Sequence, residues 1–112
     1  MKNIINLTPH IIRVQTQNET IEFLPTNIPA RMEVVQLDLG MINGISVRGS
    51  SYGNISDLPE PQENTIYIVS TLIAQRAKRL DLVSPDTFNG VIRDKDNRIF
   101  AVTAFQCFVE NK

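Results

Sequence analysis

The sequence predicts a small α+β domain, mostly β, in which one main helix follows a central strand of a mixed or antiparallel sheet. The segment Thr65–Ser70 is nearly continuously apolar and β-branched, which is typical of a strand covered on both faces. The next segment, Thr71–Leu80, places Ile73, Ala77 and Leu80 at helical spacing, with polar and basic side chains opposite. The chain therefore passes from a central strand directly into a helix.

Short β-rich runs separated by turn residues surround this unit. Asn3–Leu7 and Ile11–Thr16 are predicted strands, and a hairpin turn at 17–19 leads into Thr20–Leu24, where apolar and polar residues alternate. Arg31–Leu39 is a further predicted strand. These strands make β-structure the dominant content of the domain.

The middle of the chain is predicted to be irregular. Gly40–Gly44 breaks the strand pattern, and Ile45–Arg48 restores it only briefly. Gly49–Asn64 holds two glycines, two prolines and many small polar residues, so we expect a long loop. Long loops inside compact domains often carry function, although an ordinary surface connection is the equal alternative.

After the helix, residues Asp81–Thr87 are predicted to turn the chain back. Val91–Arg93 then enters a hairpin turn at 94–97, and Arg98–Val109 returns as one long apolar strand. Cys107 lies in this strand and is expected to be a buried small hydrophobe.

Composition narrows the class of protein. The 112 residues suit a single domain spanning 1–112, and the net charge of −1 argues against a general DNA or RNA binder. The single cysteine allows no intrachain disulfide. The first ten residues are too polar for a signal-peptide core, and no apolar run is long enough to span a bilayer. We therefore expect a soluble protein of the cytosol.

Strong catalytic motifs are absent from the sequence. It contains neither a Gly-x-x-x-x-Gly-Lys phosphate loop nor a Gly-x-Gly-x-x-Gly turn. One histidine and one cysteine are too few for a typical zinc site. We accordingly assign no catalytic residue, no metal and no cofactor.

The strand-to-helix junction is the first candidate binding site. A helix start presents free N–H groups and partial positive charge, to which Ser70 and Thr71 add hydroxyl groups. Arg76 and Arg79 on the same helix offer bidentate geometry to a phosphate. Simple helix capping and a solvated basic face explain the same residues without a ligand.

Asn6, Thr8 and His10 form the second candidate. In an extended chain these side chains project on the same side, where an amide, a hydroxyl and an imidazole suit a nucleobase or a ribose. Histidine is also the side chain that most often acts as a general acid or base in enzymes, so His10 is a candidate for that role. The alternative is a turn shaped by Thr8 and the proline that follows it.

Two further residues complete the candidate set. Tyr52, in the predicted loop, has the ring needed to stack on a base, or it is an exposed loop aromatic. Asp86 offers an acceptor for ligand hydroxyls, or it caps a turn after Pro85.

Several segments together resemble a widespread group of small, largely uncharacterised proteins of bacteria and their phages. The segments are Asn6–His10, Leu58–Pro61, Thr65–Ser70, Asp81–Asp86 and the closing hairpin at Arg93–Ile99. The resemblance assigns no activity and no site residues. It implies a setting in which small phage proteins counter host defence, and some of those sequester nucleotide signals.

The leading functional hypothesis is a phage-type anti-defence protein that sequesters a nucleotide-derived immune signal without cleaving it. The signal would be a cyclic dinucleotide, a cyclic oligonucleotide or an ADP-ribose derivative. A homo-oligomer is expected, because Phe105 and Phe108 exceed what one small core covers. The alternatives are a protein-interaction inhibitor of a host defence enzyme, or a small hydrolase that uses His10 with Asp81 or Asp86.

Overall fold

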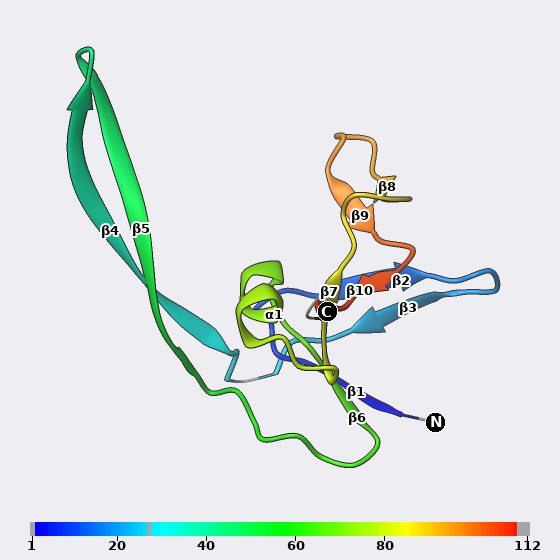
Figure 1. Ribbon diagram of the computed structural model, residues 1–112. Helices are drawn as coiled ribbons and strands as arrows, with labels where there is room; N and C mark the ends of the chain where they lie inside the picture. Colours follow the sequence, from blue (N-terminus) through cyan, green and yellow to red (C-terminus); the bar gives the residue numbers. More distant parts are fainter. Residues whose placement is uncertain (1, 27, 110–112) are drawn as a thin grey trace.

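A four-stranded mixed sheet forms the body of the protein in the computed structural model, which describes residues 2–26 and 28–109 (Figure 1). The first three strands run parallel, and the fourth runs antiparallel to its neighbour. In spatial order the strands are β1 (Asn3–Asn6), β6 (Thr65–Ile68), β7 (Leu82–Pro85) and β10 (Phe105–Gln106). The domain is thus mostly β, with a mixed sheet as predicted.

Two small hairpins lie beside this sheet. A single residue bridge connects β1 to the segment after the first hairpin, at Asn6 and Pro25, and another joins the two hairpins, at Val14 and Val102. The strands are β2 (Ile12–Gln15) with β3 (Thr20–Phe23), and β8 (Ile92–Arg93) with β9 (Ile99–Ala101). The predicted strands of the first 24 residues are confirmed to within one residue at each end.

The core lies around β6, which is the central strand that the sequence predicts. Tyr67, Ile68, Val69 and Leu82 are at most 1% exposed, and β6 lies between β1 and β7 in the sheet. Ile73 of the helix packs into the same cluster. Burial of this continuous apolar run provides the main driving force that joins sheet and helix.

The helix α1 (Thr71–Ala77) is shorter than predicted. Ser70 caps its start, as expected, by accepting a hydrogen bond from the backbone N–H of Ile73 at 3.3 Å. Lys78 adopts a left-handed conformation (φ 51°) and ends the helix. Leu80, predicted to share the buried helix face, is instead 76% exposed.

The predicted turn at Asp81–Thr87 is wrong, because Leu82–Pro85 forms β7. Parallel pairing with β6 creates this strand, and the Tyr67 N–H donates to the Asp81 carbonyl at 2.8 Å. Only long-range pairing supports such a short strand, so the local residue pattern did not indicate it. Pro85 stands at the strand end, where a missing N–H is tolerated.

A long two-stranded hairpin projects from the body and is here called the arm (Figure 1). It consists of β4 (Arg31–Ile42) and β5 (Ile45–Ser56). The break predicted at Gly40–Gly44 is confirmed only at 43–44, because β4 continues to Ile42, and the loop predicted from Gly49 is wrong up to Ser56. The arm extends the molecule, whose radius of gyration is 16.7 Å, whereas a compact domain of this length has about 13 Å.

A two-residue turn, Asn43-Gly44, joins the strands of the arm. Both residues have positive φ, 51° and 80°, which matches the twist of a two-residue hairpin. Gly40 stands in a register shift of β4 with a φ of 87°, so this glycine accommodates a bulge instead of ending the strand. The remaining predicted loop, residues 57–64, is irregular as expected.

The single long strand predicted for Arg98–Val109 is also wrong, because the chain there is split between β9 and β10. Phe105 packs on Phe23, with ring centroids 6.0 Å apart, and Phe108 packs against the core. Cys107, predicted to be buried, is exposed. Because both phenylalanines are half-buried within their own chain, they do not supply the uncovered surface from which a homo-oligomer was inferred.

Candidate functional site

Tyr52 and Arg76, two candidates far apart in the sequence, meet in the structure. Tyr52 lies on β5 near the base of the arm, and Arg76 lies in the last turn of α1. The guanidinium carbon of Arg76 is 5.5 Å from the centre of the Tyr52 ring, which is a cation–π distance. Tyr52 is 39% exposed and Arg76 is also exposed, so the pair faces solvent.

The charge of Arg76 is not neutralised by an ion pair with any residue that the structure describes. A flat aromatic ring beside a free guanidinium offers a stacking surface and a charged donor to the same ligand. Together the two side chains form the candidate site, which is here called the Tyr52–Arg76 pair.

Arg79 has a different role from Arg76. Its guanidinium donates to both carboxylate oxygens of Asp81, at 2.9 and 2.6 Å, and to the Pro59 carbonyl at 3.1 Å. The hydrogen bond from Arg79 holds the pKa of Asp81 below its ordinary value, and the same contact raises the pKa of Arg79. Arg79 therefore ties the helix end to the segment that follows the arm.

Asn6 and Thr8 are buried and build a turn. The Asn6 side-chain amide donates to the carbonyls of His10 and Phe23, at 2.7 and 2.9 Å. Its oxygen accepts from the Thr8 N–H at 2.9 Å and from the Thr8 hydroxyl at 2.7 Å. These bonds occupy the polar groups that the sequence suggested for a ligand, and leave only His10 exposed.

The start of α1 shows capping and no further polar group aimed at a ligand. The Ser70 hydroxyl serves as the cap, and the Thr71 hydroxyl donates to Ser84 Oγ at 3.3 Å. Arg76 lies in the last turn of this seven-residue helix, so the helix start and Arg76 occupy its two ends. The structure thus does not gather Ser70 and Thr71 with the Tyr52–Arg76 pair.

Asp86 follows β7, and its carboxylate accepts from the Phe88 N–H at 3.0 Å, which is the turn-capping arrangement. No hydrogen bond or ion pair joins His10 to Asp81 or Asp86, all three of which the structure describes. Within residues 2–26 and 28–109, no group of three His, Cys, Asp or Glu side chains is placed to hold a metal ion.

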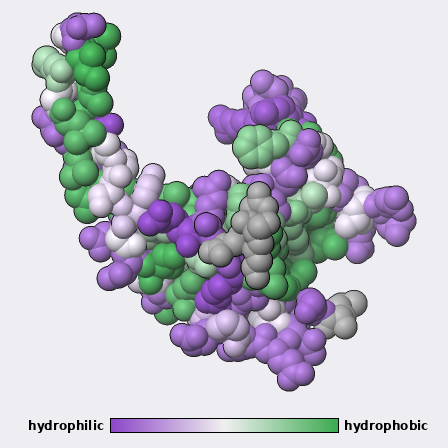
Figure 2. Space-filling model, viewed as in Figure 1, coloured by the Kyte–Doolittle hydropathy of each residue, from purple (hydrophilic) through white to green (hydrophobic). Residues whose placement is uncertain are grey.

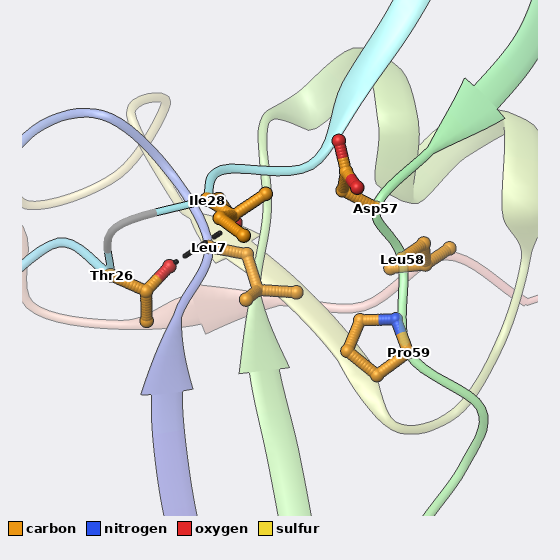
Figure 3. Close-up of a pocket in the computed structure, with 6 residues that line it drawn as sticks. All are labelled: Leu7, Thr26, Ile28, Asp57, Leu58 and Pro59. Atoms are coloured by element: carbon orange, nitrogen blue, oxygen red, sulfur yellow. Dashed lines mark hydrogen bonds between the residues drawn. The ribbon is translucent and has the colours of Figure 1, made fainter.

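A hollow of about 490 Å³ opens at the root of the arm, and sequence reasoning missed it. Figure 3 shows Leu7 and Ile28 on one side of this root hollow and Leu58 and Pro59 on the other. Thr26 and Asp57 complete the lining. The segments that enter β4 and leave β5 therefore frame an apolar cavity. In the sequence, the only sign of this hollow is that apolar residues stand among prolines in the segment before β4 and in the segment after β5.

The chain matches no family model, no curated protein and no solved structure. None of the described residues forms a helix that is both long enough and apolar enough to cross a membrane.

Proposed function

We propose that this protein is a non-catalytic, phage-type binding protein that sequesters a small nucleotide-derived signal at the Tyr52–Arg76 pair. The observation that carries the proposal is the contact of an exposed aromatic ring with an exposed guanidinium that has no carboxylate partner among the described residues. Bases stack on aromatic and guanidinium planes, and a phosphate accepts charge-assisted hydrogen bonds from Arg. The resemblance to small phage proteins supports a role against host defence.

Sequestration fits these side chains better than hydrolysis does. Asp81 is held by Arg79, and Asp86 accepts a backbone N–H of its own turn. Neither carboxylate is bonded to His10, so no assembled acid–base pair supports a hydrolase. A bound signal would accordingly be released intact when the protein is denatured.

Calorimetric titration with cyclic dinucleotides, cyclic oligonucleotides and ADP-ribose derivatives tests the proposal. We expect one class to bind at micromolar concentration or tighter. Arg76→Ala and Tyr52→Ala should each weaken that binding by about tenfold, because each removes a contact worth about 1.5 kcal/mol. Tyr52→Phe keeps the ring and should bind as the wild type does.

Arg98→Ala is the matched control, because it removes an exposed arginine from a turn on another part of the body. It should leave the affinity unchanged. Absence of binding to every ligand of the panel would sink the proposal, and so would equal losses in the Arg76→Ala and Arg98→Ala variants. Mass spectrometry of the released ligand separates the mechanisms, because a changed mass identifies an enzyme.

A protein-interaction inhibitor is the second candidate function, and the arm is the observation that favours it. An exposed apolar hairpin with unpaired strand edges is a common means of contacting another protein. This candidate expects a stable complex with one host enzyme and no small-molecule ligand. Loss of that complex on replacing Val35 and Leu37 with serine would support it.

A further inference from the structure

One face of the arm carries large apolar side chains that no described residue covers. Alternation along β4 places Val35, Leu37 and Leu39 on the same face, where they are 47%, 42% and 61% exposed. Figure 2 shows hydrophobic residues along much of the arm. A two-stranded hairpin on its own is only marginally stable in water, so a surface of this kind favours burial against a partner.

The tip of the arm is apolar as well. Met41, Ile42 and Ile45 flank the Asn43-Gly44 turn and are 71%, 64% and 69% exposed. Hairpin tips in water are ordinarily polar, because the turn meets solvent on all sides. Three large apolar side chains here indicate that the tip enters an apolar environment.

The root hollow is such an environment, and it lies at the other end of the same arm. Leu7, Ile28, Leu58 and Pro59 line it with apolar groups. Ile28 remains 63% exposed, so the hollow is open to an incoming side chain. Each strand of the arm has 12 residues, which spans about 40 Å. The tip therefore cannot reach the hollow of its own chain.

A second copy with its arm antiparallel brings tip and hollow together. A two-fold axis near Leu37, close to the centre of β4, places each residue before Leu37 opposite a residue after Leu37 in the partner chain. Val35 then faces the partner's Leu39, and the tip of the partner's arm reaches the base of this arm, where the root hollow opens. One symmetry operation thus buries the apolar face, both tips and both hollows.

The area of the arm face alone is too small to hold a stable dimer. A ribbon about 40 Å long and about 10 Å wide covers roughly 400 Å² on one face, about half of the roughly 800 Å² that each partner of a stable complex buries. The face therefore needs a further contact to hold a dimer, and the tip in the hollow provides it at both ends.

The charges of the arm also favour a copy of the same chain. Arg31 and Arg48 balance Glu33 and Asp38, and Asp38 stands opposite Arg48 in the strand register. A neutral ribbon meets its own copy without like-charge repulsion, and it offers no excess charge to a nucleic acid or a charged peptide.

We propose that the arm is a homodimerisation element, in which two arms lie antiparallel and the tip of each occupies the root hollow of the other. This proposal does not rest on the Tyr52–Arg76 pair or on any ligand. It differs from the expectation drawn from Phe105 and Phe108, because it assigns the contact to the arm.

Sedimentation velocity of the full chain, from low to high micromolar concentration, provides the first measurement. We expect a dimer that dissociates on dilution. The double variant I42D/I45D, at the tip, and Ile28→Asp, in the hollow, should each weaken the dimer by at least about tenfold. Phe88→Asp is the matched control, because Phe88 is an 84% exposed apolar residue of the body, and it should leave the dimer intact.

Mixing the tip variant with the hollow variant distinguishes tip-in-hollow contact from general apolar association. Each mixed dimer retains one intact tip and one intact hollow, so mixing should restore association that neither variant shows alone. A wild-type chain that stays monomeric at high micromolar concentration overturns the proposal. A dimer that is unaffected by both variants, or a mixture that restores nothing, also overturns it.

Discussion

The ion pair between Arg79 and Asp81 fixes the chain where α1 ends and β7 begins. Arg79 reaches Asp81 Oδ2 at 2.6 Å, and both side chains are at most 25% exposed. Because Arg79 also donates to the Pro59 carbonyl, it joins the end of α1 and the start of β7 to a segment twenty residues earlier in the chain. Its role is to position the loop that follows the arm.

The Arg79–Asp81 pair makes the free energy of unfolding decrease at acid pH. The pKa of Asp81 in the folded chain lies below its ordinary value of 3.8, so the carboxylate stabilises the fold above that pH. As the pH falls below about 4, Asp81 is protonated in the unfolded chain before it is protonated in the folded chain. The stabilisation from the carboxylate therefore decreases, and it is lost once the pH falls below the pKa of Asp81 in the folded chain. Asp81→Asn should therefore lower the free energy of unfolding at pH 7 by about 1–3 kcal/mol and flatten its decline between pH 5 and 2.

Urea denaturation across this pH range measures the effect. Arg79→Ala should produce the same flattening, and the double variant should add little to either single change, because the two side chains act as one pair. Independent, additive losses would show that the pair is not the cause.

At the scale of secondary-structure elements, closure of the arm depends on the conformation of its Asn43-Gly44 turn. Gly44 has a φ of 80°, and a Cβ there would meet no atom within 4 Å, so substitution strains the backbone without a clash. Gly44→Ala should weaken closure of the hairpin by about 1 kcal/mol. Hydrogen exchange should accelerate in β4 and β5 while β6 keeps its protection.

Ser46→Ala provides the control for this change, because it adds no backbone strain two residues farther along β5. It should leave exchange in the arm close to that of the wild type. Uniform acceleration throughout β6 in the Gly44→Ala variant would contradict a locally closing arm.

The same elements show what the sequence can and cannot predict. The central strand and the capped helix start were predicted correctly, because a continuous apolar run and a serine cap are local signals. The part of β5 after Arg48 and all of β7 were missed. Gly49, Ser50 and Ser51 have little β propensity, and they are extended because β4 pairs with them.

The candidate site was predictable as residues but not as an arrangement. Tyr52 and Arg76 were both singled out. Only the pairing of β4 with β5 and the position of α1 bring the guanidinium carbon of Arg76 to 5.5 Å from the centre of the Tyr52 ring. For Asn6 the structure favours the alternative that the sequence offered, a turn at Thr8 and the proline after it, and not a ligand-binding face. The bonds of Asn6 with Thr8 and His10 are local, but the bond to the Phe23 carbonyl depends on the fold and leaves no local pattern.

For the chain as a whole, the body should fold without the arm. Only Met32 and Ile55, at the base of the arm, pack against the core cluster. Replacing residues 33–54 with a short Gly-Ser turn should therefore leave a cooperative thermal transition and the far-ultraviolet circular dichroism of the body. The urea m-value should fall, since less surface is exposed on unfolding.

Circular dichroism and calorimetry of this deletion variant provide the check. The variant should also be monomeric under conditions in which the full chain dimerises. A chain that is unfolded without residues 33–54 would show that the arm belongs to the cooperative core, and the separation of body and arm would be wrong.

The position of the arm between β1 and β6 bears on how fast the protein folds. These parallel strands pair across about sixty residues of chain, from Asn6 to Ile68, which is a slow search for a free coil. Hairpins close in microseconds, so we expect the arm to bring Arg31 next to Ser56 before β1 and β6 pair. We expect the closed arm to shorten the remaining search, so that a hairpin on the surface raises the rate at which the interior assembles.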